Sequence, residues 1–176
     1  MRLTKIYQSK MYGNYWSGIV IFGLLIGFGL IIEVLLRSLF TTPISQPVSL
    51  IEIITQLVFM FIGVYVFKIN LEEKKITFKK SYMLGLGSGI VGSIIYGMFL
   101  YVYALYLDKD FIQRCYEIQR NIKSNSTLTD QQVMDMATPS LIAFSGILLS
   151  SVVSILLALI VAILLRNEKG QLIKNT

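Results

Sequence analysis

The chain has 176 residues, of which 55 % are apolar and 15 % are charged, with a formal net charge of +6 and no histidine. Ordinary globular domains carry roughly 25 % charged residues, so the composition excludes a typical water-soluble domain, and the length suits a single domain. The lack of histidine also excludes His-based metal sites and nucleophilic catalysis by Ser-His or Cys-His pairs.

The first apolar segment contains no charged residue between Tyr15 and Ile32. An uncharged apolar stretch of about 18 residues or more can cross a bilayer as a helix, and we predict a first span over about residues 15–36. A secretory signal also begins with basic residues and an apolar run, but this run is too long and no small-residue cleavage site follows it. We therefore expect a span that is retained.

Three charged residues and one amide lie near the junction of the first span and a second span, which we expect at about residues 48–67. They are Glu33, Arg37, Glu52 and Gln56. Glu33 and Arg37 have the spacing of an i, i+4 ion pair. Because Glu33 follows Tyr15 by about 27 Å of helix, we expect it near the outer interface. We interpret these residues first as structural anchors, and second as a small polar site for a proton or ion, since acids in membrane spans are functional candidates.

The segment from Ser81 to Leu107 carries no charge and predicts a third span over about residues 82–107. It contains GSGIVG (87–92), which has the G-x-G-x-x-G pattern of dinucleotide-binding motifs. That motif requires a buried strand before it and an amphipathic helix after it, whereas here a charged segment precedes it and an apolar segment follows. We therefore exclude nucleotide binding.

Small residues instead recur every four positions along the third span and along a fourth span, which we expect at about residues 140–165. The two series, called the small-residue ladders below, are Ser81, Gly85, Gly89, Ser93 and Gly97, and Gly146, Ser150, Ser154, Ala158 and Ala162. Small residues at this spacing let helix backbones approach closely in a membrane, so we expect the ladders to face each other. Tyr96 is deep enough in its span to need a partner, either a backbone carbonyl or Glu52.

The connection between the third and fourth spans, residues 108–139, is longer than most unstructured loops. Four apolar residues in its first part have helical spacing: Phe111, Cys115, Ile118 and Ile122. Thr129 with Gln132 resembles a capping box at the start of a second helix. We predict a helical hairpin that projects from the membrane with its tip near residues 124–126. An amphipathic segment lying on the membrane surface is the alternative.

Two further features of this connection concern its chemistry. Cys115 is the single cysteine, so it cannot form a disulfide within the chain, and we expect a packed thiol rather than an intermolecular bridge. Asn125, Ser126 and Thr127 form a glycosylation sequon, which matters only in a pathway that glycosylates.

The distribution of Lys and Arg predicts the orientation. Eleven basic residues lie in the N-terminal tail, the connection between the second and third spans and the C-terminal tail, against five on the other side. Basic connections stay cytoplasmic, so we expect both termini in the cytoplasm and the protein in the cell inner (cytoplasmic) membrane. The basic clusters meet anionic lipid headgroups, so no nucleic-acid partner is needed to explain them.

With these features the chain resembles a family catalogued as domain of unknown function 4199, which comprises small four-span inner-membrane proteins, mostly of Bacteroidetes. The resemblance covers nearly the whole chain. It is most specific in ITFKKSYMLGL (76–86), IIYGMFLYVYALYLDKDFIQ (94–113) and MATPSLIAFSGILLS (136–150). It implies four spans with a helical outer segment, and it brings no activity and no catalytic residue. The tip NIKSNSTLT (121–129) departs from the Glu- and Met-rich helix more usual in the family.

The expected fold is thus an all-α polytopic membrane protein, with four transmembrane helices and an extracytoplasmic helical hairpin between the third and fourth. The first hypothesis for its function is a non-enzymatic assembly or scaffold component that acts through the hairpin and the small-residue grooves, with itself or a larger complex. The second is a small transporter or channel subunit that uses the acidic residues. No enzyme, metal or cofactor is expected, because the sequence holds no acid–base or nucleophile constellation.

Overall fold

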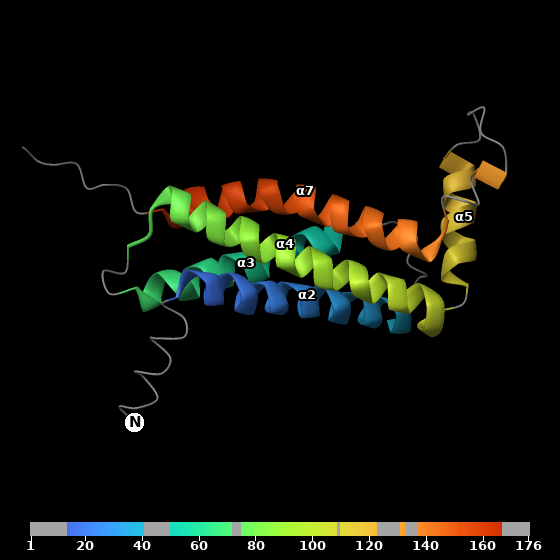
Figure 1. The fold of residues 1–176 in the computed structure, drawn as a ribbon, viewed down its shortest axis with the longest axis horizontal. Helices are drawn as coiled ribbons and strands as arrows, with labels where there is room; N and C mark the ends of the chain where they lie inside the picture. Colours follow the sequence, from blue (N-terminus) through green and yellow to red (C-terminus); the bar gives the residue numbers. More distant parts are fainter. Residues whose placement is uncertain are drawn as a thin grey trace, which may run out of the picture.

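The computed structural model describes residues 14–40, 50–71, 75–108, 110–122, 131–132 and 137–166. Its helices in chain order are α2 (Tyr15–Phe40), α3 (Leu50–Asn70), α4 (Phe78–Val102), the π-helix η1 (Tyr103–Leu107), α5 (Phe111–Ile122) and α7 (Pro139–Leu165). The described ranges contain no strand. Figure 1 shows the four long helices side by side, with α5 at a steep angle across one end of the bundle, called the α5 end below. The expected all-α fold is confirmed.

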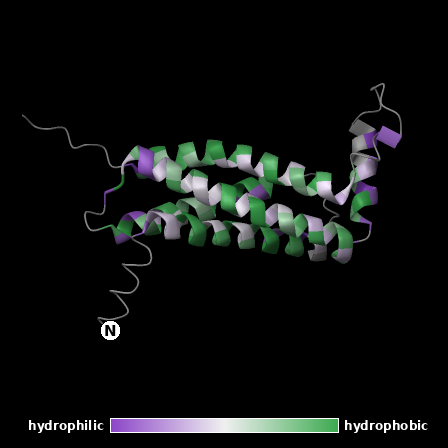
Figure 2. Ribbon diagram, in the orientation of Figure 1, coloured by the Kyte–Doolittle hydropathy of each residue, from purple (hydrophilic) through white to green (hydrophobic). Residues whose placement is uncertain are grey.

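Four helices are long and apolar enough to cross a membrane: Tyr15–Ser38, Leu50–Asn70, Phe78–Leu107 and Pro139–Leu165. At about 1.5 Å per residue each is at least about 30 Å long, which is enough to cross the hydrocarbon core of a bilayer. Large apolar side chains such as Phe28, Met98 and Leu164 are exposed on the outside of the bundle, where lipid takes the place of water. Figure 2 shows a mostly hydrophobic bundle, with hydrophilic residues at the end opposite α5 and on α5 itself. The chain is therefore a multi-pass membrane protein.

Helix α4 is central and packs most extensively on α7. The two small-residue ladders form this antiparallel contact. A Cβ added to Gly85 would lie 3.3 Å from the Cβ of Ala158, and one added to Gly89 would lie 2.5 Å from the Ser154 hydroxyl. One turn further along α4, the hydroxyls of Ser93 and Ser150 are hydrogen-bonded at 2.9 Å. Only small side chains allow the two helices to approach this closely.

A second face of small residues joins α4 to α2, which runs parallel to it. A Cβ on Gly23 would lie 3.1 Å from the carbonyl oxygen of Ser88, and one on Gly27 would lie 3.3 Å from that of Gly92. Within GSGIVG, Gly87 and Gly92 contact side chains of α2, whereas Gly89 contacts α7. Each glycine of the apparent nucleotide motif therefore accommodates a neighbouring helix. Sequence analysis found the ladder toward α7 and missed this second face.

The third span does not continue straight into the outer helix. At η1 the Asp108 amide donates to the Tyr103 carbonyl at 3.0 Å, and the Asp108 side chain accepts from the amide of Asp110 at 3.2 Å, as in an Asx turn. The same carboxylate accepts from the Tyr103 hydroxyl at 3.1 Å and pairs with Arg114. These contacts end α4 and redirect the chain into α5.

Helix α5 covers the α5 end with its apolar side. Phe111 is buried and packs edge-on against Tyr103, with ring centroids 5.4 Å apart, while Ile112 and Cys115 are partly buried against the core. The predicted second arm opened by Thr129, the hairpin tip at residues 124–126 and the tail residues used to predict orientation lie outside the described residues, apart from positions 131–132.

Candidate functional site

Four polar side chains from three helices meet inside the bundle. Glu33 and Arg37 come from α2, Glu52 from α3 and Tyr96 from α4, and we call this group the carboxylate cluster. Glu52 lies in the first turn of α3, where the positive end of the helix dipole favours an acid. Glu33 and Arg37 lie one turn apart on α2, so their side chains share one face.

A single guanidinium nitrogen lies between the two carboxylates. Arg37 Nη2 is paired with Glu33 Oε1, and the same nitrogen is 3.9 Å from Glu52 Oε1. The Tyr96 hydroxyl donates to Glu52 Oε1 at 2.9 Å, so Glu52 is the partner that Tyr96 takes. The structure therefore brings Glu33 and Arg37 of the first span together with Glu52 of the second.

The cluster is almost completely enclosed by protein. Glu52 is 3 % exposed and Tyr96 is 2 % exposed, and the side chains of Glu33 and Arg37 are 10 % and 14 % exposed. Glu33 Oε2 is buried and accepts no hydrogen bond from any described residue. Buried acceptors are nearly always hydrogen-bonded, so this oxygen is a polar group whose partner is missing from the packed bundle.

The cluster also lies well inside the lengths of the helices that can span a membrane. Counted from the middle of its own span at about 1.5 Å per residue, Tyr96 lies about 5 Å away, Glu33 about 10 Å and Glu52 about 12 Å. All three values are smaller than the roughly 15 Å half-thickness of a hydrocarbon core. Sequence analysis expected Glu33 near the outer interface; in the structure α2 continues for another seven residues beyond it, to Phe40.

A second group of uncharged polar side chains continues from the carboxylate cluster toward the middle of the bundle. This hydroxyl cluster consists of Gln56, Ser93, Ser150 and Ser154, all buried. The Gln56 amide nitrogen donates to the Ser154 hydroxyl and to the Ser150 carbonyl at 3.3 Å, and Ser93 and Ser150 are bonded to each other. Sequence analysis interpreted the three serines only as packing residues. The sequence does carry a signal for this cluster. Ser93 lies three residues before Tyr96 on α4, and Ser150 and Ser154 lie four residues apart on α7, so each pair shares one helix face.

Apolar side chains close the column of polar residues on its far side. Met60 lies one helical turn beyond Gln56 on α3 and is fully buried. Its sulfur and methyl groups pack over Gly85 and Gly89 of α4. Leu84 and Ala158 are also fully buried in the core of this half of the bundle. The hydrogen-bonded polar side chains of the two clusters therefore end next to Met60, and two separate buried hydroxyls, of Ser81 and Ser88, lie on α4 in the other half of the bundle.

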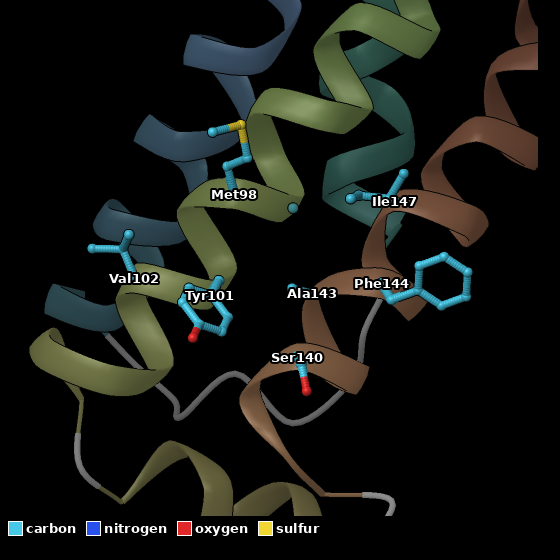
Figure 3. A pocket seen from close by; sticks show the side chains of 8 residues that line it. Met98, Tyr101, Val102, Ser140, Ala143, Phe144 and Ile147 are labelled. Atoms are coloured by element: carbon cyan, nitrogen blue, oxygen red, sulfur yellow. The ribbon is translucent and has the colours of Figure 1, made fainter.

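A separate apolar groove runs along the outside of the bundle between α4 and α7, with a volume of about 380 Å³. Its lining is Gly97, Met98, Tyr101 and Val102 from α4, and Ser140, Ala143, Phe144 and Ile147 from α7. Figure 3 shows the Tyr101 and Ser140 hydroxyls at the same end of the groove. None of these lining residues is charged, so the shape of the groove suits an apolar lipid chain and the groove supplies no charged group.

The chemistry of the described residues converges on the carboxylate cluster. Among them, no group of three or more His, Cys, Asp or Glu side chains could hold a metal ion. The cluster offers instead two carboxylates, one fixed positive charge and one phenol in a water-poor setting. Such a set can bind and release a small cation or a proton.

Comparison with known proteins gives one match. A family model described as a protein of unknown function, DUF4199, matches residues 12–167. No curated protein and no solved structure matches the chain.

Proposed function

This chain belongs to the DUF4199 family, and because the description of that family names no activity, we propose from the geometry that it is a small transporter or channel subunit that carries a cation through the carboxylate cluster. The observation that carries the proposal is that two buried carboxylates, Glu33 and Glu52, share one guanidinium inside the membrane-spanning bundle. We propose no enzymatic step.

Charge balance is the physical reason. With both carboxylates ionised and Arg37 positive, the cluster carries one excess negative charge. An uncompensated charge in a low-dielectric interior costs several kcal/mol. A bound cation or proton removes that cost, so the cluster has an intrinsic affinity for one positive charge. A purely structural ion pair would need only one of the two acids.

The arrangement also provides a route. Gln56 lies one turn beyond Glu52 on α3, and Ser93 lies about one turn before Tyr96 on α4, so the carboxylate cluster and the hydroxyl cluster together form a polar column that leads from the α5 half of the bundle to its middle. For the cation to pass beyond Met60, helices α3, α4 and α7 must separate there. The small side chains of the ladders permit this movement because no large side chains have to be unpacked. With the basic connections in the cytoplasm, the α5 end faces outward and the protein sits in the inner membrane.

An assembly role is the second candidate, and one observation favours it. Helix α5 stands across the end of the bundle with Gln113, Glu117 and Arg120 exposed, which suits contact with a partner outside the membrane. The small-residue ladders do not serve this role, because they are filled by each other within the chain.

Ion flux into proteoliposomes tests the proposal. The purified chain should pass monovalent cations or protons when a gradient is applied, and Glu52→Gln should lower the rate about tenfold or more, since 1.4 kcal/mol already changes an equilibrium constant tenfold. Glu117→Gln is the matched control, because it removes an exposed acid of α5. Equal flux in the wild type and Glu52→Gln, or no flux in either, rejects the transport function and leaves assembly as the candidate.

A further inference from the structure

We propose that the species bound by the carboxylate cluster is a proton, and that Arg37 is a resident cation that exchanges carboxylates with it. In the described arrangement Arg37 pairs with Glu33 and the proton is on Glu52. In the second arrangement the proton is on Glu33 Oε2 and Arg37 pairs with Glu52. This inference rests on the proposed function and names its ion.

The positions of the contacts define the two arrangements. Arg37 Nη2 is bonded to Glu33 Oε1 and is 3.9 Å from Glu52 Oε1, which is beyond hydrogen-bond distance. A shift of about one ångström would therefore bring this nitrogen into hydrogen-bond distance of Glu52. Glu52 is stabilised in this arrangement by the Tyr96 hydroxyl at 2.9 Å, so it does not depend on the guanidinium.

The destination of the proton is a carboxylate oxygen of the cluster that the packing leaves open. Glu33 Oε2 is buried and accepts no hydrogen bond from any described residue. When the O–H bond of Glu52 breaks, its electron pair stays on the Glu52 carboxylate, and a new O–H bond forms at Glu33 Oε2. Arg37 then pairs with the ionised Glu52. The cluster holds two acids, one proton and one guanidinium before and after the step, and its net charge stays zero.

Among the described residues, no other charged side chain is ion-paired with the cluster. Helix α2 supplies Glu33 and Arg37, α3 supplies Glu52, and α4 supplies Tyr96, which lies within electrostatic reach of all three. Helix α7 has no ionisable residue between Pro139 and Leu165. At the α5 end, Asp108 and Arg114 are paired with each other. A single proton therefore neutralises the cluster.

A metal cation fits this arrangement poorly. Hard cations such as Ca²⁺ take six to eight oxygen ligands, whereas the cluster offers two carboxylates and one phenol. A metal cation bound between Glu33 and Glu52 would also lie against the positive guanidinium of Arg37, which already occupies that position. A proton needs only one oxygen lone pair and no coordination shell.

Infrared spectroscopy of the purified full chain in lipid tests the protonation states without relying on transport. The wild type should show one buried protonated carboxyl at neutral pH, seen as a carbonyl stretch that shifts in deuterated buffer. Glu52→Gln and Glu33→Gln should each lose this band, because the one acid that remains is balanced by Arg37. Arg37→Gln should increase the band about twofold, because two buried acids without a counter-cation each take a proton. Glu117→Gln should leave it unchanged.

Flux measurements on the same preparations separate this inference from the proposed function. We expect an imposed pH gradient to be dissipated by the wild type, with no uptake of Na⁺ or K⁺, and Glu33→Gln to block the proton flux. Uptake of Na⁺ or K⁺ without proton flux would leave the proposed function standing and overturn the proton assignment. Absence of every flux would overturn both. If Glu52→Gln does not fold, Glu52→Asp should fold and retain the infrared band, and a missing band in that folded variant also overturns the assignment.

Discussion

Tyr96 and Glu52 join the third span to the second through a hydrogen bond of 2.9 Å in which the phenol donates to a carboxylate that is 3 % exposed. The two residues are separated by 44 positions in sequence. Their contact ties α3 to the central helix at the level of the carboxylate cluster, and it shows that the partner of Tyr96 is Glu52 and not a backbone carbonyl. Its loss has a measurable consequence for stability.

Tyr96→Phe should destabilise the protein by about 1–3 kcal/mol, because it leaves a buried carboxylate without its donor. Thermal unfolding in detergent measures the change. Tyr65→Phe is the matched control, since Tyr65 is 47 % exposed on the outer side of α3, and it should unfold at the wild-type temperature. Equal unfolding temperatures for Tyr96→Phe and the wild type would show that the hydroxyl adds nothing to stability.

Gly89→Ala should cost about 1–3 kcal/mol, the usual range for overpacking, because its new Cβ would lie 2.5 Å from the Ser154 hydroxyl. Gly85→Ala, in the same ladder, should cost less, since the nearest atom there is 3.3 Å away. Gly89→Leu should fail to accumulate in membranes, as expected for a groove filled within one chain. A Gly89→Leu protein that accumulates normally but loses a partner would instead place that ladder at an interface between chains.

Met60→Gln should raise the ion leak through reconstituted protein several-fold, because an amide at this position extends the polar column past the apolar barrier. Met60→Leu preserves the apolar character and approximate volume, so it should leave the leak unchanged. The measurement is decay of an imposed pH gradient in proteoliposomes. If both variants behave alike, Met60 is not the barrier.

Cys115 should react slowly with small alkylating reagents near neutral pH. Burial raises the pKa of its thiol above the ordinary value; the Arg114 charge lowers that pKa and the Asp108 charge raises it to smaller extents. Because the thiolate is the nucleophile, a raised pKa lowers the reactive fraction, and the rate should rise at higher pH than for an exposed thiol.

The control for this measurement is Gln113→Cys in a Cys115→Ser background, since Gln113 is exposed on the same helix. Denaturation in detergent should bring the two thiols to the same rate profile. A Cys115 that reacts as fast as the control in the folded protein would show that α5 does not pack its thiol against the bundle.

Several features follow from local sequence alone. The four spans are set by apolar runs with few charged residues that are long enough to cross a bilayer, and length and charge are properties that no tertiary contact alters. The faces that α4 and α7 present to each other follow from the four-residue spacing of their small residues. The need of Tyr96 for a partner follows from its depth, although sequence left a carbonyl and Glu52 as alternatives.

Tertiary structure decided which groups meet. Glu33 and Arg37 are neighbours by helical spacing, but their contact with Glu52 depends on how far α3 extends into the bundle and on its angle to α2, which residue spacing does not contain. The second small-residue face, with Gly23 and Gly27 against α4, required knowing which helices are neighbours. The turn at Asp108 depends on one side chain bonding three groups at once. The sequence determines which side chains lie on each face of each helix. The packing between helices that are distant in sequence determines which of those side chains meet in a site.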